Sequence, residues 1–114
     1  MSAGPASYVG EFEQLVLLSI LRLGGDAYGV TIARELEDRA GRSVARGALY
    51  TTLDRLEDKG LIRWKLAPGG DERARVPRRR YAVTARGVAA VKASHGVLTR
   101  MWAGLEDVLG DGTQ

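Results

Sequence analysis

The chain has 114 residues, of which 45% are hydrophobic and 27% charged, and it contains no cysteine. This length fits a single domain with one modest core, and the lack of cysteine excludes disulfides and thiolate metal sites. No apolar run approaches the ~20 residues of a membrane span, and Met1–Val9 lacks the features of a signal peptide. We therefore expect a cytoplasmic protein with no membrane association.

The net charge of +3 is unevenly distributed. Residues 59–86 carry nine basic residues and two acidic ones, a net charge of +7 that leaves −4 for the rest of the chain. Positive charge concentrated in one segment is typical of proteins that bind a polyanion. A charge run that is merely solvated is the alternative interpretation.

The first expected helix, Gly10–Leu23, follows a flexible N-terminal segment of residues 1–9. Apolar side chains, Phe12 and Leu15 among them, cover almost its whole circumference. A helix that is apolar on every side must be covered on every side, and in so small a domain we expect a second subunit to supply part of that cover.

A second helix is expected over Tyr28–Ala40. Asp26 is a suitable N-cap residue, and Gly41 is suited to end the helix. The link from Gly41 to Ala45 is short, as expected for a helix-turn-helix.

The third helix, within Arg46–Gly60, carries the strongest signal in the chain. Leu49, Leu53 and Leu56 recur at spacings of four and three, which indicates one buried face. The first half of the opposite face holds small, hydroxyl and basic groups without an acid, and this suits a helix that lies against DNA. Acidic residues in the second half would repel phosphates, so only the first two turns are expected near a duplex. Taken alone, the pattern also fits an ordinary amphipathic helix.

Two short strands, Leu61–Leu66 and Arg79–Val83, are predicted after this helix, with a loop rich in glycine and proline between them. Such a hairpin behind a recognition-type helix forms a wing. Basic side chains at its tip and base could reach phosphates or a minor groove. They are Arg73 and Arg75 at the tip and Arg78, Arg79 and Arg80 at the base. Trp64 is expected to pack the wing onto the body.

The last helix is expected over Ala85–Leu109, with Thr84 as its N-cap. Apolar residues and one histidine recur along it in alternating steps of three and four, the spacing of a helix that packs lengthwise on another helix. The seam consists of Val88, Val91, His95, Leu98, Trp102, Leu105 and Leu109. We expect it to pair with its own copy or with the first helix of a partner; packing wholly within one subunit is the alternative. Gly96 lies inside this helix, where glycine costs ~1 kcal/mol relative to alanine, and either close packing at a dimer crossing or a local bend would account for it.

Several motifs together resemble the PadR family of bacterial transcriptional regulators, in particular its short members with a single C-terminal helix. They are GEFEQLVLL from Gly10, AYG from Ala27, GALYTTLDRL from Gly47, KGLI from Lys59 and YAVTARG from Tyr81. Their order along residues 10–105 makes the resemblance specific.

The resemblance implies a mostly helical α+β fold, a winged helix-turn-helix with a two-stranded wing and a long C-terminal dimerisation helix. In residue numbers, a flexible segment (1–9) precedes a DNA-binding domain (10–83), a dimerisation helix (84–109) and a flexible tail (110–114). The family binds palindromic double-stranded operators as a homodimer. The residues expected to contact DNA are Tyr28, Arg46, Gly47, Tyr50, Thr51 and Arg55, together with the five wing arginines. The residues expected to form the dimer are Leu15 and the seam residues.

One position departs from the family pattern. Many relatives have a serine where Ala45 stands, and that serine would cap the recognition helix. The loss of such a cap weakens a helix by ~1 kcal/mol. Ser43 or a main-chain arrangement could substitute for it, or the end of the helix frays until DNA binds.

Similar regulators often sense small aromatic or hydrophobic compounds near the dimer interface, some of them through a tryptophan on the C-terminal helix. The candidate effector site here is formed by Trp102, Leu98, His95 and Phe12, with Trp102 and its copy as flat walls for a planar ligand. The simpler interpretation of Trp102 is a large seam residue. Two facing copies of His95 would make the dimer pH-dependent, because both would repel when charged.

The sequence therefore favours a homodimeric, sequence-specific DNA-binding regulator, a repressor released by a small effector. The alternative is a winged-helix protein-interaction module without sequence-specific DNA binding. We expect neither a cofactor nor a metal, since a single histidine without cysteine makes no metal site. We also expect no enzymatic activity, because the chain lacks a phosphate-binding glycine loop and a nucleophile–base pair.

Overall fold

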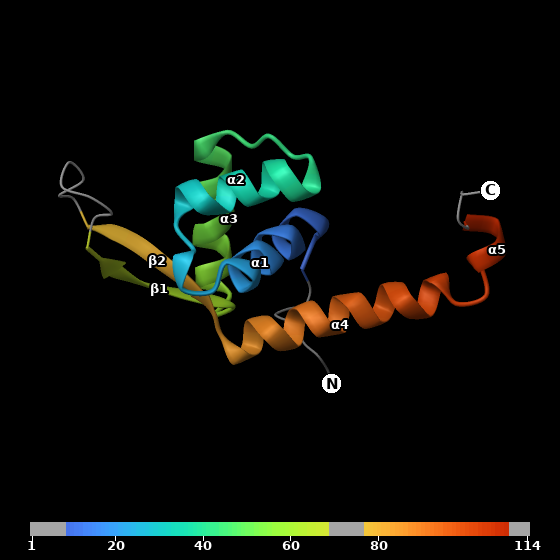
Figure 1. The fold of residues 1–114 in the computed structure, drawn as a ribbon. Helices are drawn as coiled ribbons and strands as arrows, with labels where there is room; N and C mark the ends of the chain where they lie inside the picture. Colours follow the sequence, from blue (N-terminus) through green and yellow to red (C-terminus); the bar gives the residue numbers. More distant parts are fainter. Residues whose placement is uncertain (1–8, 69–76, 110–114) are drawn as a thin grey trace.

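A computed structural model describes residues 9–68 and 77–109 of the chain and has the predicted mostly helical architecture with a two-stranded sheet (Figure 1). In chain order the elements are α1 (Glu11–Leu23), the 3-10 turn η2 (Gly24–Asp26), α2 (Gly29–Ala40), α3 (Arg46–Asp58), β1 (Ile62–Ala67), β2 (Arg78–Val83), α4 (Ala85–Trp102) and α5 (Glu106–Leu109).

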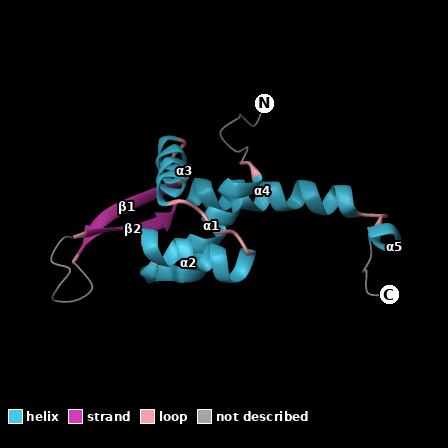
Figure 2. Cartoon of the chain, turned by 90° about the horizontal axis from the view of Figure 1, so that it is seen from above, coloured by secondary structure: helices cyan, strands magenta, loops and turns pink. Residues whose placement is uncertain are grey.

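Helix α1 is the centre of the domain. It contacts α2, α3, α4 and β2, and in the view from above it lies between α2 and α3 (Figure 2). The strands, which we call the wing, project at one end of the body and α4 projects at the other. The described part of the chain contains no helix long and apolar enough to cross a membrane.

The core is built from one face of each helix. Val16, Leu17 and Ile20 of α1 are buried, as are Leu49, Leu53 and Leu56 of α3, which confirms the buried face predicted for the third helix. The other buried apolar residues of the main cluster are Val9, Ala27, Ile32, Leu36, Leu61, Ile62, Tyr81 and Ala90. The chain itself covers only part of the apolar surface of α1, since Leu18 and Leu21 remain exposed.

Helix α2 begins at Gly29, and its N-cap residue is Tyr28 instead of the predicted Asp26. The physical reason is that Asp26 belongs to the turn η2, after which Ala27 is extended and accepts a hydrogen bond from the Tyr81 N–H (2.9 Å). Thr31 Oγ1 caps the helix by accepting the Tyr28 N–H (2.9 Å). Gly41 ends α2 in the left-handed region (φ 68°), as predicted.

Helix α3 ends at Asp58, and Gly60 follows in the left-handed region (φ 78°). The Leu61 N–H donates to the Leu56 carbonyl (3.0 Å), which closes the helix and turns the chain into β1. At the other end Ala45 is the N-cap residue, and no side chain caps the helix. The Ala45 carbonyl accepts the Leu49 N–H (3.0 Å).

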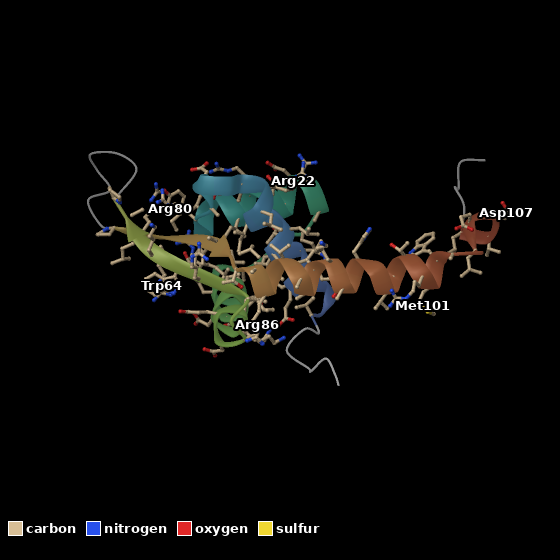
Figure 3. All side chains as sticks on the ribbon, turned by 90° about the horizontal axis from the view of Figure 1, so that it is seen from below. Arg22, Trp64, Arg80, Arg86, Met101 and Asp107 are labelled. Atoms are coloured by element: carbon tan, nitrogen blue, oxygen red, sulfur yellow. The ribbon has the colours of Figure 1, made fainter. Side chains whose placement is uncertain are left out.

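The wing is an antiparallel pair with Trp64 opposite Tyr81 and Lys65 opposite Arg80. Alternation along the strands puts Trp64 and Arg80 on opposite faces, and their side chains project to opposite sides of the ribbon in Figure 3. Trp64 is partly buried and packs against the core, as expected for a residue that fixes the wing to the body.

The last helix is shorter than predicted. Its N-cap Thr84 is confirmed, since Thr84 Oγ1 accepts the Gly87 N–H (3.1 Å), but α4 ends at Trp102 and not at Leu109. Gly104 takes the left-handed region (φ 88°), and its N–H donates to Glu106 Oε1 (3.0 Å). Leu105 and Leu109 therefore lie beyond the continuous part of the seam, because Ala103 (ψ 129°) has already left helical geometry while the apolar spacing continues.

A compact joint connects the end of α3 to the start of α4. Thr84 Oγ1 donates to the Gly60 carbonyl (2.8 Å), and the Thr84 N–H donates to the Leu61 carbonyl (2.9 Å). A methyl group at Gly87 would overlap the Leu61 carbonyl oxygen and Val83, so only glycine lets α4 start this close to β1.

Candidate nucleic-acid interface

The outer face of α3 is open to solvent where DNA contacts were predicted. Arg46, Gly47 and Thr51 are exposed, and Tyr50 is partly buried at the flank. The N-cap residue Ala45 has no side-chain group that could hydrogen-bond the first N–H groups of the helix. The first N–H groups of a helix attract anions, and this end of α3 leaves them without a capping side chain.

Tyr50 is held against the first residue of α2. A methyl group at Gly29 would overlap the Tyr50 hydroxyl and ring carbon, so glycine at position 29 lets the Tyr50 side chain lie where it does against the start of α2. Within the motif Ala27-Tyr28-Gly29, the contact with Tyr50 gives a physical reason for the glycine.

Two arginines at the base of the wing stack on aromatic rings, one on the body and one within the wing. The Arg78 guanidinium lies over the Tyr28 ring (3.9 Å to the centroid), and the Arg79 guanidinium lies over the Trp64 ring (4.1 Å). Arg79 Nη1 is also 3.9 Å from Asp54 Oδ1 on α3. Stacking orders an arginine without consuming its hydrogen-bond donors, so both residues keep donors for another partner.

These contacts converge on one groove between the start of α2, the outer flank of α3 and the base of β2. Four of the predicted DNA-contacting residues line it: Tyr28, Tyr50, Arg78 and Arg79. The other lining residues are Gly29, Val30, Asp54 and Pro77. We call this surface the wing groove. Because the chain segments that form it are far apart in sequence, the groove exists only in the folded domain.

Other predicted contacts lie outside the wing groove. Arg80 is on the opposite face of the wing from Trp64 (Figure 3). The Arg55 side chain extends along the flank of α3 toward Glu13 of α1, where its Nη1 is 3.8 Å from Glu13 Oε2. Arg73 and Arg75 lie outside the described residues.

The residues proposed for effector binding do not form one site within a single chain. Phe12 packs against the core, whereas His95, Leu98 and Trp102 are exposed along α4. Among the expected dimer residues, Leu15 and Val91 are partly buried and Val88 is exposed. Within the described ranges no three His, Cys, Asp or Glu side chains are placed to hold a metal ion.

The chain matches the family described as "Transcriptional regulator PadR-like family" over residues 17–93. No curated protein sequence matches it.

Solved structures of similar fold include a PadR family transcription regulator from Clostridium difficile R20291 (22% identity, 88% of this chain and 100% of that chain covered, TM-score 0.69). Another is a PadR family transcriptional regulator from Eggerthella lenta DSM 2243 (26% identity, 89% and 84% covered, TM-score 0.63). A third is the complex structure of hsRosR-S1 (30% identity, 90% and 85% covered, TM-score 0.61).

The buried Tyr81 of β2 gives the stability of the fold a predicted pH dependence. Burial raises the pKa of the Tyr81 hydroxyl, while the positive charge of Arg79 acts in the opposite direction. Since the folded pKa exceeds the unfolded value of about 10, the neutral hydroxyl stabilises the fold below that pH, and this stability is lost as the pH rises further.

Thermal unfolding of the wild type and Tyr81→Phe at pH 7 and at about pH 10.5 measures this effect. We expect the variant to lose less stability than the wild type between the two pH values. Tyr28→Phe is the matched control, because no buried hydroxyl is removed there. An equal loss in the wild type and Tyr81→Phe would show that Tyr81 is not responsible.

Proposed function

Since the chain belongs to the PadR-like family of transcriptional regulators, we propose that it is a homodimeric repressor that binds an inverted-repeat operator in double-stranded DNA. Its family is one of transcription regulators and not of enzymes. The same proposal places the protein in the cytoplasm. The alternative, a protein-interaction module, needs neither an operator nor a dimer, and the experiments below separate the two.

The wing groove is the observation that carries the DNA-binding proposal. It joins the start of α2, the recognition helix α3 and the wing in one surface that holds two aromatic hydroxyls and two stacked arginines. Hydroxyls and arginines bond phosphates and base edges. Gly47 and Thr51 on the exposed face of α3 leave room for a close approach to a base pair.

The roles of the individual side chains follow from their positions. Thr51 and Tyr50 are the proposed base-edge or phosphate contacts of the first turns of α3, beside Arg46. Arg78, Arg79 and Arg80 are the proposed phosphate contacts of the wing base. Asp54 pairs with Arg79, so the acidic half of α3 lies beside a cation and need not repel the duplex fully.

The exposed seam of α4 supports the homodimer. The face of α4 that faces the body carries Gly87 and Ala90, which are buried, whereas Leu98 and Trp102 are each about half exposed. An unpaired apolar stripe of this length is typical of a helix that packs on another helix. Leu18 and Leu21 of α1 are exposed as well and extend the apolar surface available to a second copy.

Exposure of Trp102 also supports the effector proposal. Its ring is half exposed in the single chain, so a second copy could complete a pocket of two indoles. A planar aromatic compound would stack between such rings. We propose this class of compound as the signal that releases the repressor from DNA.

Binding to operator DNA can be tested directly. In a gel-shift titration the protein should prefer the DNA upstream of its own gene over random-sequence competitor. Replacing Arg78, Arg79 and Arg80 together by alanine should weaken binding to both DNAs alike and reduce the salt slope by about 0.9 for each phosphate contact that is lost. Arg100→Ala, outside the wing groove, is the control. A protein that prefers neither DNA would contradict the proposed function.

The second prediction concerns the dimer. Sedimentation at micromolar concentration should give the mass of two chains for the wild type and of one chain for Leu98→Glu, because the variant buries a charge in the seam. Ala93→Glu adds the same charge on the opposite, exposed side of α4 and should leave the dimer intact. A monomeric wild type would instead favour the interaction module.

The third prediction concerns the effector. In a Trp64→Phe background, a panel of planar aromatic compounds should include one that quenches Trp102 fluorescence and lowers DNA affinity at the same concentrations. Replacing Trp102 by phenylalanine in the protein with Trp64 intact should abolish the effect on DNA affinity. If no compound changes either signal, the effector proposal fails, while DNA binding itself is unaffected.

A further inference from the structure

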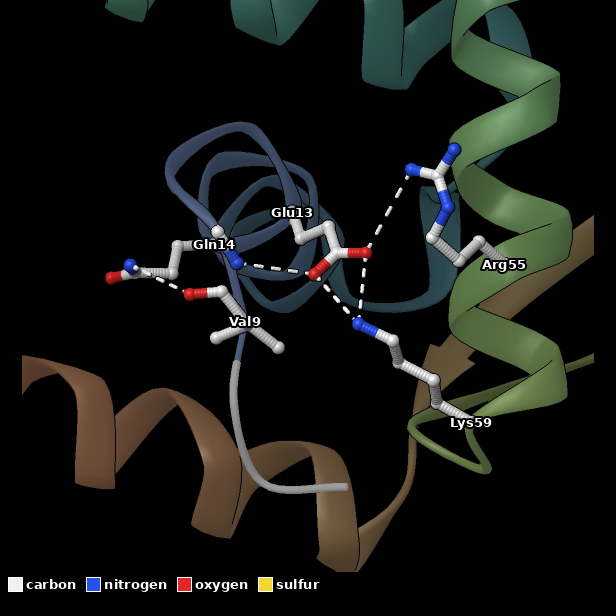
Figure 4. A network of polar contacts seen from close by, with 6 residues as sticks. Val9, Glu13, Gln14, Arg55 and Lys59 are labelled. Carbon is white, nitrogen blue, oxygen red and sulfur yellow. Dashed lines mark hydrogen bonds and ion pairs between the residues drawn. The ribbon is translucent and has the colours of Figure 1, made fainter. Parts of the chain in front are cut away.

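A buried carboxylate lies between α1 and the recognition helix. Glu13 is 8% exposed, although an ionised side chain is seldom buried without partners. Its Oε1 accepts the Gly10 N–H (3.1 Å) at the start of its own helix. Its charged partners come from α3 and from Lys59, the residue that follows this helix (Figure 4).

Two cations approach this carboxylate, at different distances. Lys59 Nζ is 3.0 Å from Oε1 and 3.1 Å from Oε2, so it makes two hydrogen bonds. Arg55 Nη1 is 3.8 Å from Oε2, within ion-pair distance but beyond hydrogen-bond distance. The Arg55 side chain is 52% exposed and that of Lys59 30%.

This difference makes the two cations unequal. If Lys59 left, the buried carboxylate would lose its hydrogen-bonded charge partner, and an unpaired buried charge is strongly destabilising. If Arg55 left, Lys59 and the Gly10 N–H would still satisfy the carboxylate. Arg55 can therefore leave the carboxylate with little loss of stability. It also projects from the helix proposed to lie on DNA.

We propose that Glu13 holds Arg55 in the free protein and releases it to a DNA phosphate on binding, while Lys59 remains as the permanent bridge between α1 and α3. Glu13 is thus a positioning residue that competes with the duplex for Arg55. The inference rests on the proposed DNA-binding function and deepens it, because it assigns a role to a residue that does not itself touch DNA.

The consequence for energetics is specific. A phosphate that takes Arg55 releases condensed counterions, so Arg55 contributes to the salt dependence of binding. The attraction of Glu13 for Arg55 must be overcome first. Removing the charge of Glu13 should therefore strengthen binding, whereas removing a residue with a purely structural role would weaken binding or leave it unchanged.

The experiment measures fluorescence anisotropy with a labelled random-sequence duplex of about 25 base pairs, long enough for two half-sites, over a range of KCl concentrations. We expect Arg55→Ala to reduce the slope of log affinity against log salt by about 0.9, and Lys59→Ala to leave the slope unchanged. Glu13→Gln should bind about two- to fivefold more tightly, the range for a weak ion pair, because the Arg55 side chain is half exposed and beyond hydrogen-bond distance.

The matched control for Glu13→Gln is Glu11→Gln. Glu11 is two residues away on α1, exposed, and paired with Arg42 (2.7 Å). If Glu11→Gln tightens binding as much as Glu13→Gln does, total charge explains the effect and the proposal fails. It also fails if Arg55→Ala keeps the wild-type slope, or if Lys59→Ala reduces the slope as much as Arg55→Ala.

The proposal can still be tested if the Glu13→Gln variant does not fold. A circular dichroism melt identifies a Glu13→Gln variant that has unfolded, and in that case the slopes of the wild type and Arg55→Ala still test the proposal, since Arg55 lies outside the core. A wild type that shows no salt-dependent DNA binding would overturn the proposed function. A wild type that binds DNA with the same slope as Arg55→Ala would overturn only the inference about Glu13.

Discussion

The burial of three leucines on α3 is the constraint on which the rest of the structure depends. Leu49, Leu53 and Leu56 lie against the core and are almost fully buried, which fixes the rotation of the helix about its axis. Full burial of each leucine stabilises the fold by about 1.5–3 kcal/mol. Once these three are inside, Gly47 and Thr51 must face solvent, and Tyr50 must lie beside α2. The surface proposed to contact DNA is thus the face of α3 that the core leaves exposed.

Much of this arrangement could be predicted from the sequence, because it follows from spacing and from glycines. The leucine spacing identifies the buried face of α3, and Gly41 and Gly60 end their helices as expected. The apolar spacing alone places the end of α4 too late. It continues to Leu109, whereas Ala103 already leaves the helical region (ψ 129°) and Gly104 is left-handed, so the helix ends at Trp102.

Long-range contacts account for the remaining differences. Asp26 has the right chemistry for an N-cap, but pairing between Ala27 and Tyr81 draws that segment toward β2. Likewise, no local pattern indicates that Gly29 must admit Tyr50, or that Glu13 and Lys59 would meet across 46 positions of the chain. Stacking of Arg78 on Tyr28 and of Arg79 on Trp64 also depends on the folded wing. These contacts between distant segments give the candidate interface its detail.

The joint at Thr84 has a mechanical consequence. Its hydroxyl binds the residue that closes α3 and also caps α4, and Gly87 brings the first turn of α4 against the Leu61 carbonyl. Hydrogen bonds of Thr84 thus join the end of α3 directly to the start of α4. A change in the tilt of α4 would therefore act directly on the carbonyls of Gly60 and Leu61, the residues that follow α3 and lead into β1.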